Sequence, residues 1–140
     1  MAVDLPADLP QLSETTVGAA RAHSKPVPPT GIVHIGLSNF HRGHLAVYTA
    51  TAVDQVGGDW GIAASTRRRD IAESMLAQDL LYSVVDFAPG TEAITVPAAH
   101  TAVLDTAAGA GELVAAIANP ATKIVSLTIT EAGYKFSPRT

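Results

Sequence analysis

The sequence contains no cysteine, little charge and no long apolar run, and each absence removes a class of protein. Without cysteine among its 140 residues, neither a disulfide scaffold nor a thiolate metal site can form, and the composition fits a cytoplasmic protein. No apolar run approaches the roughly 20 residues of a membrane-spanning helix, so we expect no membrane partner. The first residues are acidic positions among prolines, not a basic segment before an apolar one, so we expect no secretory signal.

Basic charge is also scarce. Nine Lys and Arg residues stand against thirteen Asp and Glu, the net charge is −4, and the basic residues are scattered apart from the run at residues 67–69. A nucleic-acid-binding module needs a basic face to neutralise phosphates, so no nucleic-acid partner is expected. Hydrophobic residues make up 47% of the chain, which is typical of a globular domain with a buried core.

Short apolar runs alternate with helical patterns after a proline-rich lead-in at residues 1–30, where residues 13–22 favour a short helix. The expected strands are residues 31–36, 60–66, 81–87 and 123–130, with a shorter one at 94–96. The expected helices are residues 40–56, which Asn39 can cap and Gly57 ends, then 70–78 and about 113–118; residues 98–112 read as a connection. This alternation predicts an α/β fold for residues 31–140. It is a Rossmann-like parallel sheet with flanking helices, the incomplete first half of a doubly wound fold.

The candidate functional segment is residues 36–44, directly after the first expected strand. A dinucleotide site needs a tight turn there, so that backbone amides and a helix N-terminus approach the pyrophosphate. Gly36 suits such a turn, and Arg42 could place a cation near the phosphates. Ser38 and His41, however, stand where the generic fingerprint has its second and third glycines. On this motif alone, nucleotide binding and an ordinary turn are about equally favoured.

Three segments resemble the mannitol dehydrogenase and fructuronate reductase family of polyol-specific long-chain dehydrogenases. They are GIVHIGLSNFHRGH at residues 31–44, AQDLLYSV at 77–84 and NPATKIVSLTITEAGY at 119–134, in the family's order. The resemblance implies hydride transfer between a nicotinamide cofactor and a small polyol or uronate, such as oxidation of mannitol or reduction of fructuronate or tagaturonate. It also implies a cofactor-binding Rossmann domain followed by a mostly helical domain that closes over the substrate.

The resemblance places the cofactor at the ends of the first and last strands. The candidate cofactor-binding residues are Ile35, Gly36, Leu37, Ser38, Asn39, Phe40, His41, Arg42, Arg67, Asp70, Thr130 and Glu131. Ser38 replaces the family's usual glycine at the closest approach to the pyrophosphate, where its side chain either crowds the phosphates or donates a hydrogen bond to them.

The choice of cofactor depends on the residues after the second strand. An acidic residue there binds the ribose hydroxyls of NAD, whereas arginine suits the additional phosphate of NADP. Arg67, Arg68 and Arg69 favour NADP, Asp70 keeps NAD open, and a solvated turn without a cofactor role is the alternative. Because the family mostly uses NAD, NAD is the expected cofactor and NADP the second choice.

No residue is assigned to catalysis or to a metal. In the family, the catalytic lysine and its Asn and His partners lie in the C-terminal domain, which is absent here, and neither Lys123 nor Lys135 matches that motif. His34, His41 and His44 have no nearby cysteine or suitably placed carboxylate, so no metal site is expected.

Two other functions stay open from the sequence. The chain could be a truncated, non-catalytic remnant or a nucleotide-binding module without turnover, as the missing catalytic domain and Ser38 suggest. A methyltransferase with an adenosine cofactor is a third reading, which the segment TITEAGY at residues 128–134 argues against. The oligomeric state is undetermined, but an incomplete sheet predicts an exposed strand edge and exposed apolar surface.

Overall fold

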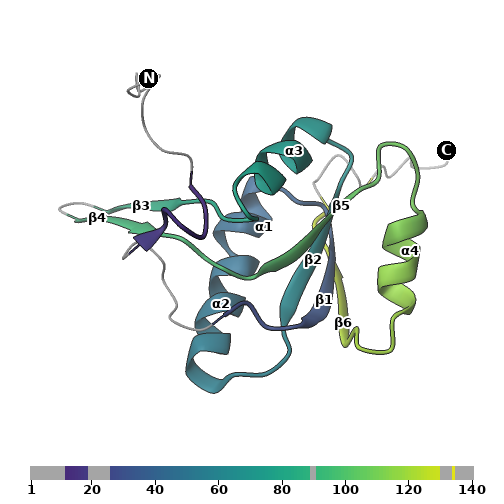
Figure 1. The fold of residues 1–140 in the computed structure, drawn as a ribbon, viewed down its shortest axis with the longest axis horizontal. Coiled ribbons are helices and arrows are strands. Elements are labelled where there is room, and N and C mark those ends of the chain that lie inside the picture. The colour runs from purple at the N-terminus through teal and green to yellow at the C-terminus, as the bar shows by residue number, and fades with distance from the viewer. Residues whose placement is uncertain (1–11, 19–25, 89–90, 130–133, 135–140) are drawn as a thin grey trace, which may run out of the picture.

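The computed structural model describes residues 12–18, 26–88, 91–129 and 134, and a four-stranded parallel sheet is its main feature (Figure 1). The elements in chain order are β1 (Thr30–Ile35), α1 (Asn39–Gly43), α2 (Leu45–Val56), β2 (Gly61–Thr66), α3 (Arg69–Ala77), β3 (Val84–Ala88), β4 (Thr91–Thr95), β5 (His100–Asp105), α4 (Gly111–Ala118) and β6 (Ile124–Leu127). No helix within these described ranges is long and apolar enough to cross a membrane.

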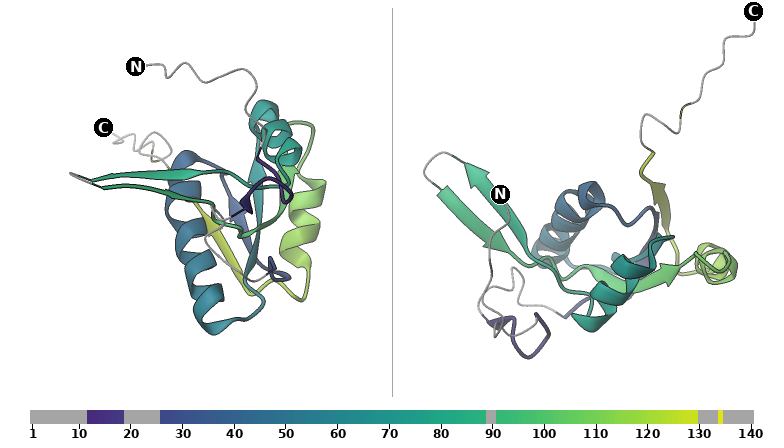
Figure 2. Two further views of the ribbon diagram at one scale, coloured as in Figure 1. Left: turned by 60° about the vertical axis from the view of Figure 1, so that its left-hand side comes forward. Right: turned by 90° about the horizontal axis from the view of Figure 1, so that it is seen from above.

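The sheet has the strand order β5-β2-β1-β6. The chain moves outward from β1 to β2 and β5, then returns to place β6 on the free side of β1, so the direction of winding reverses between β1 and β6. The helices α2 and α3 lie on one side of the sheet and α4 on the other (Figures 1 and 2). This is the first half of a doubly wound fold, and the predicted fold class is confirmed.

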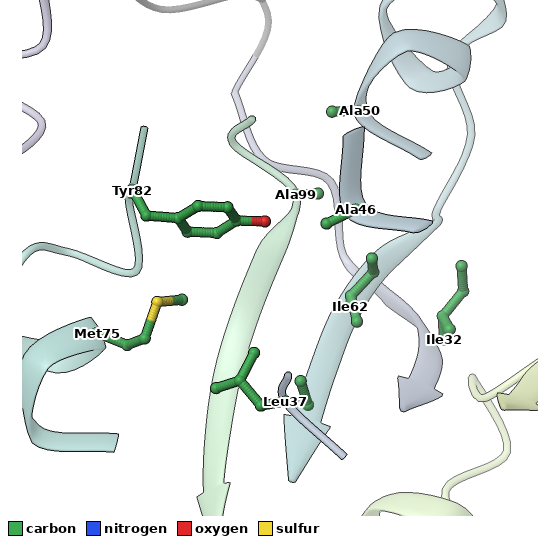
Figure 3. Packing of buried hydrophobic residues seen from close by; sticks show 9 residues of the cluster. Ile32, Leu37, Ala46, Ala50, Ile62, Met75, Tyr82 and Ala99 are labelled. Atoms are coloured by element: carbon green, nitrogen blue, oxygen red, sulfur yellow. The ribbon is translucent and has the colours of Figure 1, made fainter. Parts of the chain in front are cut away.

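The main core lies between the sheet and the α2–α3 side. Its buried members come from β1, β2, the turn after β1, α2, α3 and the segments before β3 and β5: Ile32, Leu37, Ala46, Ala50, Ile62, Ala64, Met75, Tyr82 and Ala99 (Figure 3). Alanines on α2 and β2 let the helix approach the sheet closely, and Ile62 and Met75 fill the remaining space. Fully burying side chains of this size contributes about 1.5–3 kcal/mol each.

The third strand of the parallel sheet differs from the prediction. β5 lies within residues predicted to be a connection, where neighbouring alanines hide the strand pattern. The predicted strand at residues 81–87 instead begins at Val84 and pairs with β4 in a separate antiparallel hairpin. Leu81 and Tyr82 precede that hairpin and are buried, so their hydrophobicity reflects core packing in an irregular segment.

The predicted long helix at residues 40–56 is two helices, because His44 leaves the helical conformation with φ −124° and ψ −79°. Ser38, not Asn39, caps the first of them. Gly57 ends α2 with φ +73°, as predicted. In the lead-in, the helix predicted at residues 13–22 is a hydrogen-bonded turn between Ser13 and Val17, and residues 19–22 lie outside the described residues.

β6 is shorter and more exposed than its sequence predicts. Its apolar side chains Ile124, Val125 and Leu127 are about half exposed, and among the described residues only β1 pairs with it. The predicted exposed strand edge and apolar surface are therefore present at β6.

Candidate functional site

The carboxyl ends of β1, β2 and β5 surround a cavity of about 200 Å³. Side chains from these strand ends, the following turns and α4 line it: Ile35, Gly36, Ser65, Thr66, Arg67, Thr106 and Leu113. We call it the strand-end pocket. Ligands of open α/β sheets bind at this edge, next to the point where the winding reverses.

Gly36 forms the turn between β1 and α1, beside the strand-end pocket. Its φ is +107°, a conformation that residues with a side chain rarely adopt, and a Cβ there would lie 3.6 Å from the carbonyl oxygen of Thr128 in the segment after β6. The amides of Gly36 and Leu37 both donate to the carbonyl of Ser65, at 3.1 and 2.8 Å. These bonds hold the turn against the end of β2. Because Gly36 has no side chain, the backbone of the turn stays accessible at this residue.

Ser38 ends the turn and caps α1. Its Oγ accepts a hydrogen bond from the amide of His41 at 3.2 Å, and its carbonyl accepts one from the amide of Arg42 at 3.0 Å. Asn39 and Phe40 follow the cap, and their amides have no acceptor within the helix. The serine hydroxyl is thus already engaged by the backbone, while two adjacent N–H groups stay available to an anion.

Arg42 lines a second cavity, of about 410 Å³, between α1 and the segment that leads into β3. The residues that line it are Asn39, Arg42, Gly43, Tyr82, Ser83, Val84 and Val85. The guanidinium of Arg42 donates to Oδ1 of Asn39 and lies 5.6 Å from the centre of the Tyr82 ring. The Tyr82 hydroxyl donates to the carbonyl of Arg42 at 3.0 Å, and burial raises the pKa of Tyr82, so this donor stays protonated.

Three buried histidines connect β1, α1 and β5. The rings of His34 and His41 stack at 3.8 Å, and Nε2 of His41 lies 3.0 Å from Nε2 of His100. Burial lowers the pKa of His41 and of His100 to about 3, so both rings are neutral and one donates to the other. The two ring nitrogens of His34 meet the hydroxyls of Ser126 and Thr128, which ties this group to β6.

The structure places His41 and His44, which are three residues apart in the sequence, in different surroundings. His41 is only 1% exposed, so its imidazole supports α1 from the interior and does not face the turn. His44 is exposed and stacks on Phe40. Within the described part of the chain, no three His, Asp or Glu side chains gather in a way that could hold a metal ion.

The three arginines after β2, residues 67–69, differ in their ion-pair partners. Arg68 donates to both carboxylate oxygens of Asp70, at 3.3 and 2.6 Å, and hydrogen bonds from Arg68 lower the pKa of Asp70. Nε of Arg69 lies 3.5 Å from Oδ2 of Asp105 at the end of β5. Arg67 lines the strand-end pocket, and no carboxylate of the described residues lies within ion-pair distance of it.

The structure therefore brings together Ile35, Gly36 and Arg67 of the predicted site residues. Asn39 and Arg42 face the second cavity, Ser38 is a cap, Phe40 and Asp70 are exposed, and Leu37 and His41 are buried. Thr130 and Glu131 lie outside the described residues.

Sequence reasoning missed Thr106, Asp105 and Leu113 at this edge. Asp105 ends β5, and Thr106 and Leu113 come after it, but the sequence analysis did not recognise β5 as a strand. The short apolar run at residues 102–104, bounded by Thr101 and Asp105, is the signal that could have found them.

Comparison with known proteins gives a consistent picture. Residues 30–140 match the model of the mannitol dehydrogenase Rossmann domain. The chain is 40% identical to a mannitol 2-dehydrogenase of Cereibacter sphaeroides over 109 residues, which is 74% of the chain and 23% of that protein. It is 37% identical to a polyol:NADP oxidoreductase of Gluconobacter oxydans over 116 residues, 79% of the chain and 24% of that protein.

The fold is similar to that of a solved relative. The mannitol 2-dehydrogenase of Pseudomonas fluorescens, in a ternary complex with NAD and D-mannitol, superposes with a TM-score of 0.78 and 27% identity over 89% of this chain and 27% of that one. The chain thus spans about a quarter of the length of the proteins it matches.

Proposed function

Because this chain belongs to the mannitol dehydrogenase family, we propose that it binds a nicotinamide dinucleotide of the NAD type along the carboxyl ends of β1, β2, β5 and β6. The observation that carries the proposal is the turn at Gly36, which has φ +107° and lies where the sheet changes its direction of winding. A side chain is excluded there by conformation, so a ligand can approach the backbone closely.

Different parts of this edge suit different parts of a dinucleotide. The amides of Asn39 and Phe40, directly after the turn, offer N–H groups to the pyrophosphate, because those of residues 36–38 already donate to backbone carbonyls. The strand-end pocket, with Thr66, Arg67 and Thr106, suits the adenosine half. Thr128 adjoins Gly36 just after β6 and suits the nicotinamide side. Thr130 and Glu131 lie outside the described residues, and their cofactor role stays a prediction from the family resemblance.

The protein's own contribution is position and electrostatics. A bound nicotinamide supplies the hydride chemistry. The Ser65 carbonyl holds the turn, Ser38 fixes the start of α1, and the neutral ring of His41 supports α1 from the interior. No described residue is assigned as the acid or base of the reaction.

We further propose that the activity of the protein is that of an oxidoreductase acting on a secondary alcohol of a small polyol or uronate. This rests on family membership and on the names of the relatives, which include mannitol 2-dehydrogenases and a D-mannonate oxidoreductase. Cytoplasmic location remains the expectation from the cysteine-free sequence.

The direct test is titration of the 140-residue chain with NADH, followed by nicotinamide fluorescence and by thermal melting. Saturable binding with a rise in Tm is expected, because a ligand that binds only the native state stabilises it by mass action. Gly36→Val should abolish the binding. Gly43→Ala is the matched control, since a Cβ at residue 43 meets no atom within 4 Å. A chain that melts cooperatively and binds no nucleotide would show the proposal to be wrong.

A further inference from the structure

We infer that Arg67 receives the 2′-phosphate of the adenosine ribose, so that this chain binds NADP(H) more tightly than NAD(H). The inference rests on the proposed function and adds to it the residue that selects the cofactor. It is carried by the way in which the charges after β2 are paired.

Arg67 is the residue directly after β2 and lines the strand-end pocket beside Gly36 and Thr66. In sheets of this kind, the residue at the end of the second strand lies next to the ribose hydroxyls of the adenosine. Its side chain is exposed, and the described residues place no carboxylate within ion-pair distance of it. The guanidinium is therefore ready to meet an incoming anion.

Recognition of NAD itself needs the opposite chemistry, a carboxylate that accepts hydrogen bonds from both ribose hydroxyls. In the described part of the chain, two carboxylates lie near this strand end, and both already have a partner. Asp70 receives two hydrogen bonds from Arg68. Asp105 accepts the amide of Ala107 at 2.8 Å through Oδ1 and pairs with Arg69 through Oδ2.

The local charge balance leads to the same conclusion. Three guanidinium groups meet two carboxylates, which leaves one positive charge, and Arg67 is the arginine that has no carboxylate partner among the described residues. A phosphate monoester carries about −1.5 to −2 charges at pH 7. The planar fork of arginine matches its oxygens, so the pair forms charge-assisted hydrogen bonds that an unphosphorylated ribose cannot form.

The experiment measures dissociation constants of the 140-residue chain for NADPH and NADH, and for adenosine 2′,5′-bisphosphate and 5′-AMP. We expect tighter binding of both phosphorylated ligands. Arg67→Gln should weaken NADPH about tenfold or more and change NADH by less than about twofold. Lys123→Gln is the charge-matched control, because Lys123 pairs with Asp59 at the opposite end of the sheet.

A second variant tests the role of the occupied carboxylate. Arg68→Gln frees Asp70, and it removes no helix cap because the Arg68 side chain makes no capping bond. NADH binding should improve a few-fold relative to NADPH.

Three results would overturn the inference. Tighter binding of NADH than of NADPH by the native chain would do so while leaving the proposed function intact. An equal loss of both nucleotides in Arg67→Gln would do the same, since it would make Arg67 a general contact. If a cooperatively melting chain binds neither nucleotide, the proposed function and this inference are both wrong.

Discussion

β1 and β6 are neighbouring strands with similar sequences and very different surroundings. Ile32 and Val33 of β1 are register partners of Ile124 and Val125 of β6. Ile32 and Val33 are 6% and 0% exposed, whereas Ile124 and Val125 are each 45% exposed. β1 is flanked by two strands, while β6 is the last strand of the sheet among the described residues.

The comparison shows that the apolar sequence of a strand indicates where burial is favourable, while its place in the sheet decides whether burial occurs. α4 behaves like β6: it has a continuous apolar composition and no buried residue, and Val114 is largely exposed. Large exposed apolar patches commonly mark sites of contact with other protein segments. In relatives about four times as long, there is chain available to supply it.

The largest expected effect concerns the buried histidines on the covered side. Their pKa values of about 3 lie below the unfolded value of 6.5, so the unfolded chain binds more protons between these limits. Stability is then complete above pH 6.5 and falls as the pH drops, by roughly 1.4 kcal/mol per pH unit for each of His41 and His100. Between about pH 8 and pH 5 the free energy of unfolding should fall by about 4 kcal/mol.

Urea unfolding at several pH values measures this loss. His44→Gln is the control, because His44 is exposed and lies outside the buried group, and it should leave the pH slope unchanged. A free energy of unfolding that is flat from pH 7 to 5 would contradict the burial of neutral histidines.

The register partners Ile32 and Ile124 provide the next test. Ile32→Ala should lower the free energy of unfolding by about 3 kcal/mol, because it leaves a cavity under α2. Ile124→Ala removes the same atoms from a half-exposed site and should cost less than about 1 kcal/mol. Equal costs in urea unfolding would show that the two strands are equally covered in solution.

Substitutions at two glycines, one in the covered strand β1 and one in the exposed helix α4, test the same difference at the backbone. A Cβ on Gly31, at β1, would lie 2.0 Å from the carbonyl oxygen of Asp59, whereas a Cβ on Gly111 of α4 meets nothing within 4 Å. Gly31→Ala should cost about 2 kcal/mol or more, and Gly111→Ala should be neutral or stabilise by up to about 1 kcal/mol. Thermal melting of both variants measures the difference, and a harmless Gly31→Ala would refute the close approach.

The last and smallest expected effect concerns self-association through the exposed edge of β6. Val125→Lys should reduce concentration-dependent association of the 140-residue chain, because a charged edge strand resists pairing with another copy. Leu76→Lys, at an exposed site on α3, is the control and should leave association unchanged. Sedimentation velocity over a range of concentrations distinguishes the two, and equal behaviour would mean that the β6 edge does not drive association.

Much of the fold could be predicted from local patterns. The strand ended by Gly36, the strand before Arg67, the helix stopped at Gly57 and the strand at β6 all lie where their residues indicated. β5 could not be recognised, because its flanking alanines are compatible with helix and its pairing with β2 joins residues about 40 apart. The hairpin of β3 and β4 was mistaken for part of the main sheet, since an isolated strand pattern does not specify its partner.

The candidate site shows the same division. Motif reasoning located Gly36 and Arg67, because a turn after the first strand and the end of the second strand are fixed positions in this class of fold. It grouped His41 and Leu37 with them, although both side chains point into the interior. The stacking of His34 on His41, and the contact of His41 with His100 from β5, depend on a strand that the pattern did not reveal.

By itself, the sequence determined the class of fold, the resemblance to a family and the position of the turn, because these depend on short-range spacing and on residue types. Only the tertiary structure decided which arginine has no carboxylate partner among the described residues, which histidines are buried and which apolar strand is exposed. Ion pairing and burial depend on neighbours that are distant in the chain. Arg69 finds Asp105, and Val33 finds Val125, only once the sheet has formed.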